Sequence, residues 1–266
     1  MKHVLSKLII AACASMVTLS ACAPPNSGGD TAAETSAAES ESSGETSASA
    51  AGTDTTDGAV TITMAMTAPW DTFIPFNTTN ANTDAVLELM YDKLIVVKAN
   101  GEHEPRLATK WEQDSETGKI LTFELNENAK WHDGEPVTAD DVVFTCELMA
   151  NEAITHPRRS KVAFFTGTDD SGVRVQDEDF GVVALDDHTV QFTMKDPAPI
   201  SYMLSQTFRD FYVLPEHLLA DIPADQIMTD EFWQHPIGSG PCIYESSISG
   251  ERVEFAANKD YYLGAP

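Results

Sequence analysis

The stretch LTFELNENAKWHDGEPVTADDVVFT, residues 121–145, decides the fold. It opens with a strict alternation in which Leu121, Phe123 and Leu125 lie on one face, the period of a half-buried β-strand. The run from Trp111 pairs with it as a hairpin around the polar segment SETGK. Asp133-Gly134 then turns the chain, because glycine accepts the backbone angles that tight turns need. The stretch therefore predicts a strand and then a tight turn.

A helix is predicted directly after this turn. Thr138 with Asp141 three residues later resembles a capping box, with Asp in place of the usual Glu. The capping box predicts a helix over residues 139–150. The apolar residues at helical spacing would form its buried face: Val142, Val143, Cys146 and Met149.

Further elements are predicted on both sides of this stretch. Apolar residues alternate over 60–66, as in a half-buried strand, and a helix capped by Asn82 or Thr83 comes after an Asn/Thr-rich loop. Short strands are predicted near 94–97, 182–185 and 189–194, and short helices at 199–207 and 215–220. A hairpin over 243–255 ends the chain. Strands and helices intermix without a regular βαβ alternation or a repeat, which indicates an α/β or mixed α+β class.

The N-terminus reads as an export signal. Lys2 and Lys7 flank a short basic segment, and an apolar run from Leu8 to Ala21 follows it. The residues Leu-Ser-Ala-Cys at positions 19–22 resemble the lipobox of bacterial lipoproteins. We expect cleavage after residue 21 and lipidation of Cys22. A transmembrane helix is the competing interpretation, but the run is shorter than the about 20 residues that span a bilayer. Residues 22–58 lack aromatic, large aliphatic and basic side chains, which predicts a disordered linker.

Composition excludes some functions. The 266 residues carry a formal net charge of −26, so nucleic-acid binding, which needs clustered Lys and Arg, is disfavoured. The acidity could steer cationic ligands, although a solvated surface is the simpler interpretation. Cys146 and Cys242 could form a disulfide after export, but the position of Cys146 on a helical face favours a buried thiol. Their spacing does not match a zinc or haem site.

Four segments in order resemble a known family. They are LMYDKLIVVKANGEHEPRLATKWEQ, LTFELNENAKWHDGEPVTADDVVFT, VVALDDHTVQFTMKDPAPISYMLSQ with VLPEHLL after it, and HPIGSGPCIYE with FAANKDYYLGAP. Together they closely resemble extracellular solute-binding protein family 5, the oligopeptide-, dipeptide- and nickel-binding components of ABC importers. The resemblance covers about residues 60–266.

The resemblance implies a periplasmic-binding-protein type II-like fold, of which this chain holds the N-terminal lobe only, as if truncated. Residues 59–82 and 189–266 would form lobe I, and residues 83–188 an inserted subdomain. The protein would be exported and anchored through Cys22 at the outer face of the cytoplasmic membrane. It would be a monomer that captures a peptide or other small solute and delivers it to an ABC permease and ATPase. No catalytic residues, cofactor or metal site are expected.

Two loops could contact the ligand. In the first, residues 76–84, Thr79, Asn80 and Asn82 offer donors and acceptors for peptide-like groups. Capping of the next helix is the alternative role for this loop. In the second, Phe208 could stack on a ligand and Arg209 could pair with a carboxylate. Core packing of Phe208 and a surface ion pair of Arg209 are the alternatives.

Other functions stay open at this point. Nickel, sugars or other solutes are alternatives to peptides, and a sensory receptor could use the same fold. A lipid-anchored hydrolase is a remote alternative, because the sequence lacks G-x-S-x-G and H-E-x-x-H motifs. The acidic pairs Asp140-Asp141 and Asp186-Asp187 fall at a predicted helix start and a turn. Turn or core roles are assigned to His132, Asp133 and His217, because motifs rich in Gly and Pro usually mark backbone geometry.

Overall fold

The computed structural model of the chain describes residues 53–56 and 59–266. The predicted signal peptide (1–21), the lipidation site Cys22 and the linker up to residue 52 lie outside the described residues. No helix within the described ranges is long and apolar enough to cross a membrane.

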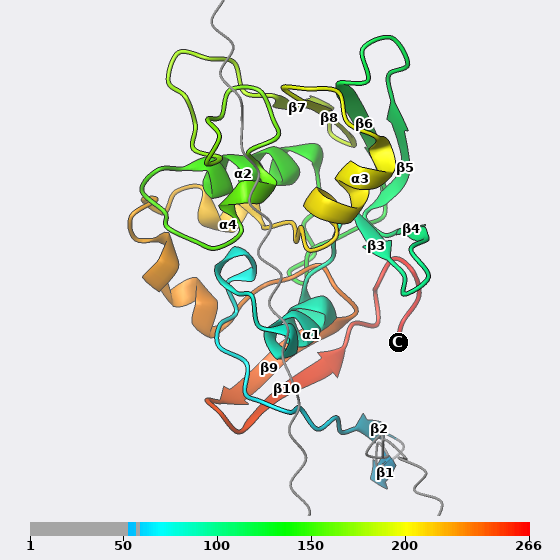
Figure 1. Cartoon of the computed structure of the whole chain (residues 1–266). Coiled ribbons are helices and arrows are strands. Elements are labelled where there is room, and N and C mark those ends of the chain that lie inside the picture. The colour runs from blue at the N-terminus through cyan, green and yellow to red at the C-terminus, as the bar shows by residue number, and fades with distance from the viewer. Residues whose placement is uncertain (1–52, 57–58) are drawn as a thin grey trace, which may run out of the picture. The chain divides into compact units, whose positions relative to one another are not determined.

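A four-stranded antiparallel sheet holds the first residues of the 121–145 stretch (Figure 1). Its strand order is β5–β6–β8–β7, with bounds β5 (Ala108–Gln113), β6 (Ile120–Leu125), β7 (Val182–Asp186) and β8 (Thr189–Thr193). Phe123 of β6 faces Trp111 of β5 on one side and Val190 of β8 on the other. The side chains of Leu121, Phe123 and Leu125 are all buried. The predicted hairpin and its alternation are therefore confirmed.

Helix α2 (Ala139–Ala150) packs on β7 and β8 (Figure 1). It begins and ends at the predicted residues, and its capping box is present, with Asp141 Oδ2 accepting from Thr138 N at 2.8 Å. The same carboxylate accepts from Trp131 Nε1 at 3.2 Å and from Glu216 N at 2.8 Å. Asp141 thus joins the WHDGEP turn, α2 and the start of helix α4 (Glu216–Leu219).

The two cysteines among the described residues do not pair, in agreement with the interpretation of Cys146 as a buried thiol. Cys146 is fully buried on α2, Cys242 is partly buried, and both are free thiols. Burial raises the pKa of the Cys146 thiol well above its usual value.

The remaining elements are mostly short. The strands are β1 (Thr53–Thr56), β2 (Ala59–Ile62), β3 (Ile95–Val97), β4 (His103–Pro105), β9 (Cys242–Ile248) and β10 (Arg252–Ala257). They form three antiparallel pairs, β1–β2, β3–β4 and β9–β10. The other helices and helical turns are η1 (Pro75–Asn77), α1 (Ala81–Met90), η2 (Arg159–Lys161), α3 (Ile200–Met203), the π-helical turn η3 (Leu204–Phe208), η4 (Ile227–Thr229) and η5 (Glu231–Gln234).

A cluster of phenylalanines forms the centre of the core. The ring of Phe208, on η3, lies 4.8 Å from the ring of Phe123 and 4.9 Å from that of Phe192, measured between centroids. Phe165 lies 5.1 Å from Phe192 in the same way. The cluster therefore fastens the sheet to the segments that come after α2 and α3, and burying each ring contributes roughly 1.5–3 kcal/mol.

The PIGSGP segment packs against the end of α1 (Ala81–Met90), and α1 also contacts β9 (Figure 1). Gly240 N donates to Met90 O at 2.7 Å, and Gly238 O accepts from His132 N at 2.8 Å. A Cβ at Gly238 would clash with the Met90 carbonyl oxygen, so the close backbone approach requires glycine there. His132 therefore joins two backbone segments, in agreement with the structural role assigned to it.

Three expectations differ from the structure near the N-terminus and the sheet. The strand predicted over 60–66 ends at Ile62, which pairs with Thr53 of β1, and the side chains of Ile62 and Met64 are 69% and 63% exposed. Strand β1 lies within the predicted linker, where β-branched threonines precede an Asp-Gly hairpin signal. The predicted lobe boundary at 188/189 falls inside the β7–β8 hairpin, and β8 pairs along its length with β6. The sheet thus crosses that boundary, because hairpin strands share their hydrogen bonds; the division into lobe I and an inserted subdomain stays a prediction.

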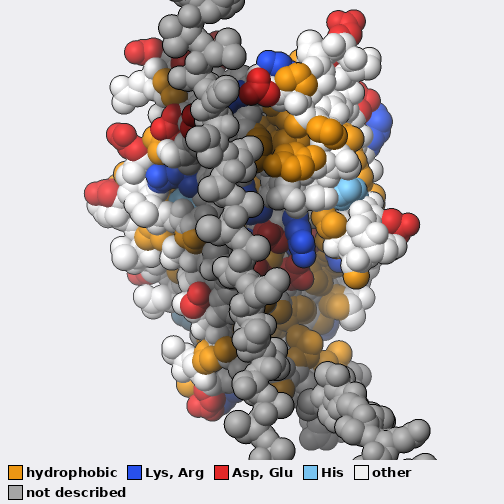
Figure 2. Space-filling model, in the orientation of Figure 1, with side chains coloured by type: hydrophobic (Ala, Val, Ile, Leu, Met, Phe, Trp, Pro, Cys, Tyr) orange, Lys and Arg blue, Asp and Glu red, His pale blue; other side chains and the backbone are white. Residues whose placement is uncertain are grey.

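The acidic surface agrees with the simpler interpretation of the net charge. Acidic side chains are spread over the face drawn in Figure 2 rather than gathered in one place, with basic side chains among them. On this face the distribution favours a solvated surface over a dedicated electrostatic binding surface.

Candidate functional site

Side chains of the first predicted ligand loop, residues 76–84, form hydrogen bonds within the loop and to the residues just before it. Thr78 is buried, and its hydroxyl donates to Asp71 Oδ1 at 2.9 Å and accepts from Asn80 N at 3.0 Å. Asn80 is the N-cap of α1, with its Oδ1 accepting from Asn82 N at 2.9 Å and its Nδ2 donating to Pro69 O at 3.1 Å. The sequence placed this cap at Asn82 or Thr83 instead. Asn80 therefore has the capping role, and both the oxygen and the nitrogen of its side-chain amide form hydrogen bonds within the protein.

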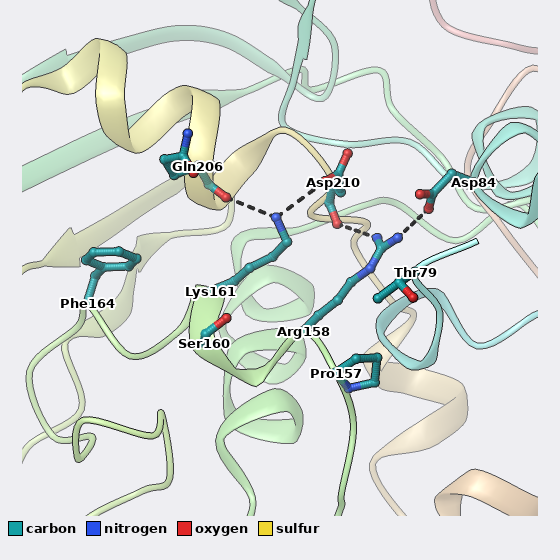
Figure 3. Close-up of a pocket in the computed structure, with 9 residues that line it drawn as sticks. All are labelled: Thr79, Asp84, Pro157, Arg158, Ser160, Lys161, Phe164, Gln206 and Asp210. Carbon is teal, nitrogen blue, oxygen red and sulfur yellow. Dashed lines mark hydrogen bonds and ion pairs between the residues drawn. The ribbon is translucent and has the colours of Figure 1, made fainter. Parts of the chain in front are cut away.

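Thr79 has a different environment. Its side chain is exposed and lines a cavity of about 470 Å³ (Figure 3). The other lining residues are Asp84, Pro157, Arg158, Ser160, Lys161, Phe164, Gln206 and Asp210. Asn82, at the start of α1, is not among them; its Oδ1 accepts from the Thr67 hydroxyl at 3.4 Å. The cavity thus joins the first predicted loop to η2 and to the residues around η3.

Arg158 organises this cavity. Its Nε donates to Thr78 O at 2.8 Å, its Nη1 to Asp210 O at 3.0 Å, and its Nη2 pairs with the Asp84 carboxylate (Figure 3). The guanidinium also lies over the Tyr212 ring, 5.9 Å from its centroid. The side chain is only 7% exposed. One guanidinium therefore ties its own segment to residues 78–84 and to Asp210, three segments that are distant in the sequence, as its planar fork of donors allows.

Lys161 is the second cation of the cavity and is held more loosely. Its Nζ donates to Gln206 O at 3.0 Å and lies 3.5 Å from Asp210 Oδ2 (Figure 3). The Phe164 ring lies on the same side of the cavity and forms an edge-on pair with Tyr202, with centroids 6.1 Å apart. The site therefore combines two cations, two carboxylates, an aromatic ring and hydroxyl groups.

Burial sets the protonation energetics of these groups. Desolvation raises the pKa of the Asp84 carboxyl, and the hydrogen bond and charge of Arg158 oppose that rise. Desolvation likewise lowers the pKa of the Lys161 amine, which the neighbouring Asp210 only partly offsets. Burial therefore disfavours the charged form of both groups, and a neighbouring opposite charge offsets part of that effect in each.

The second predicted loop divides between core and surface. Phe208 is fully buried in the phenylalanine cluster, so the stacking role proposed from the sequence is wrong for this structure and the core alternative describes it. Its ring packs among four other phenylalanine rings, and exposing it would open the core. The Arg209 side chain is 66% exposed, with its Nε 3.9 Å from Asp210 Oδ1. Its role as a carboxylate partner stays a prediction.

Sequence reasoning missed Arg158, Lys161 and Asp210 as members of one site. Arg158 and Arg159 are adjacent in a polar stretch of the sequence, but the partners Asp84 and Asp210 of Arg158 lie 74 and 52 residues away along the chain. Nothing local pairs Arg158 with Asp84.

Comparisons with known proteins give the site a context. Residues 102–266 match the family model for the middle part of bacterial extracellular solute-binding proteins, family 5. The chain is 36% identical over 184 residues to the periplasmic oligopeptide-binding protein OppA of Salmonella typhimurium, covering 66% of this chain and 32% of OppA. The chain therefore spans about a third or less of the curated relatives it matches.

Solved structures share the fold. The oligopeptide-binding protein AppA from Bacillus subtilis, in complex with a nonapeptide, superposes with a TM-score of 0.64 at 24% identity, over 75% of this chain and 36% of AppA. NikZ from Campylobacter jejuni, in complex with Ni(L-His), superposes with a TM-score of 0.57 at 28% identity, over 73% of this chain and 34% of NikZ.

Proposed function

Because the chain belongs to bacterial extracellular solute-binding protein family 5, we propose that it captures short peptides outside the cell for an ABC importer. The observation that carries this proposal is the likeness to OppA, which is named as an oligopeptide-binding protein. The fold likeness to peptide-loaded AppA supports it. The captured peptide would be handed to a membrane permease driven by an ATPase.

In this proposal, the cavity around Arg158 and Lys161 is the part of the peptide-binding surface that this chain contributes. Thr79 contributes an exposed hydroxyl and Phe164 an apolar wall, a combination that suits the alternating polar backbone and apolar side chains of a peptide. The family implies a second lobe that closes over the ligand by a hinge motion. The reaction is reversible binding, so this proposal assigns no catalytic residue.

The anchoring part of the proposal concerns the N-terminus. Lipidation of Cys22 and the part of the predicted linker that precedes β1, residues 23–52, would keep the capture domain beside its permease. A flexible coil of about 30 residues spans roughly 27–33 Å on average, which confines the domain near the membrane. Two acyl chains would be needed for stable attachment, because one gives only reversible binding.

Uptake of a labelled peptide tests the proposal. Cells that express this chain's gene with its transporter should accumulate a radiolabelled tripeptide, and cells in which the gene is deleted should not. Complementation with the gene should restore uptake, whereas a Cys22→Ser copy should restore less because the receptor drifts from the permease. Equal uptake with and without the gene would refute the transport role.

A nickel complex is the second candidate ligand. It is favoured by the likeness to NikZ, which was solved with Ni(L-His) and superposes on 73% of this chain, compared with 75% for AppA. Uptake of nickel in the presence of histidine, measured in the same strains, separates the two. Gene-dependent nickel uptake without peptide uptake would favour the second candidate.

A further inference from the structure

The charges of the cavity differ in how well they are satisfied. Arg158 and Asp84 form a close ion pair, and Arg158 donates its other hydrogen bonds to two backbone carbonyls. That pair is internally neutral and holds the cavity wall in place. It therefore has little to offer a ligand.

Lys161 has capacity left. An ammonium carries three donors, and Lys161 directs one at the Gln206 carbonyl at 3.0 Å and a second, at most, toward Asp210 at 3.5 Å. Its side chain is only 15% exposed, so water compensates the remaining donor poorly. A buried cation with one neutral partner and one distant anion favours an additional anionic group.

Asp210 does not supply that group fully. Its carboxylate is shared between Lys161 at 3.5 Å and Arg209 at 3.9 Å, both loose contacts. The four charged side chains that line the cavity, Asp84, Arg158, Lys161 and Asp210, sum to zero, and Arg209 lies outside the lining. The chain as a whole carries −26, so this neutral cavity is less hostile to a single carboxylate than the chain's overall charge would suggest.

We propose that Lys161 binds a carboxylate of the captured ligand in this cavity, with the Phe164 ring against the apolar group next to it. The proposal rests on the proposed function, because it names the ligand group that this part of the site selects. A peptide end or an acidic side chain supplies such a carboxylate. The strongly acidic chain would repel highly anionic solutes, so a ligand with a single free carboxylate fits best.

The test compares two peptides that differ only in the carboxylate. The isotope-labelled 266-residue chain is titrated by NMR with Ala-Ala-Phe as the free acid and, separately, as its C-terminal amide. We expect saturable shifts of residues 160–164 and 206–210, with the acid binding about tenfold or more tightly than the amide, the gain typical of one charge-assisted hydrogen bond. Each dissociation constant is fitted from the same resonances.

Variants assign the preference to one side chain. Lys161→Met should bring the acid-to-amide ratio close to one, and Lys161→Arg should retain most of it. Lys98→Met is the matched control, because it removes the same charge from an exposed lysine paired with Glu104 and should leave the ratio unchanged.

The outcomes separate this inference from the function on which it rests. Equal binding of acid and amide by the wild-type chain overturns the carboxylate proposal and leaves peptide capture standing. A preference for the acid that survives Lys161→Met overturns it too. If neither peptide produces a saturable shift, both the carboxylate proposal and the assignment of this cavity to peptide capture fail. The wild-type comparison decides the question even if a variant does not fold.

Discussion

Replacing Arg158 should destabilise the chain more than any other single charge change at this site. Arg158→Met keeps most of the buried aliphatic stem but removes the donors to Thr78 O, Asp210 O and the Asp84 carboxylate. Breaking one side of a buried ion pair costs about 3–5 kcal/mol. Asp84 retains 27% exposure and can recruit water, so we expect the low end, about 3 kcal/mol.

Urea unfolding followed by circular dichroism measures this loss. The midpoint should fall while the slope stays the same, because the exposed surface on unfolding is unchanged. Arg158→Lys should fall in between, since one ammonium cannot satisfy three acceptors in different directions. The matched control is Arg252→Met, which removes an exposed arginine paired with Glu251 and Glu254 and should leave the midpoint where it is.

A double variant identifies the source of the loss. Adding Asp84→Asn to Arg158→Met removes the stranded carboxylate, so the two changes together should cost less than their sum, by about 1 kcal/mol or more. Additive effects would mean that the pair contributes little. An Arg158→Met midpoint equal to that of the control would refute the idea that Arg158 holds the three segments together.

Three further changes test other parts of the structure. Gly238→Ala should destabilise the chain by about 1–3 kcal/mol in urea, because its Cβ meets the Met90 carbonyl, while Ser249→Ala should not; an unaffected Gly238→Ala would contradict the close approach. In native protein, Cys146 should be alkylated at least about tenfold more slowly than Cys242 by peptide mapping, since it is fully buried with a raised thiol pKa; equal rates would contradict its burial. Burial raises the pKa of the Asp92 carboxyl, so folding favours its protonated form. Relative to Asp92→Asn, the wild type should therefore lose stability as the pH rises from about 4 toward neutral, and a relative gain would reverse the sign of the argument.

Local sequence signals predicted the elements well. The capping box places the start of α2 at Ala139 as observed, because cap and helix residues are neighbours in the chain. The β5–β6 hairpin was predictable for the same reason, as its alternation and its turn lie within one short segment. The cap of α1 was missed by two residues, since Asn80, Asn82 and Thr83 all offer a capping side chain and tertiary contacts decide among them.

Tertiary contacts decided the site, and they were not visible in the sequence. Phe208 looks like a pocket residue beside an arginine, yet four other rings close over it, most of them from distant segments. Arg158 reaches acceptors on two segments, residues 78–84 and Asp210, and no pattern along the chain connects them with Arg158. Of the three residues predicted in the first ligand loop, Thr79 lines the cavity, whereas the side chain of Asn80 is occupied by local hydrogen bonds.

The most direct test of the central claim is to identify what the protein carries. Mass spectrometry of small molecules released from protein purified from its own cells reads the ligand without a guess about its class. We predict a recurring set of short peptides that is absent from an equally purified Lys161→Met preparation or reduced in it. A bound metal chelate or sugar in place of peptides would contradict the claim that this chain captures peptides for import.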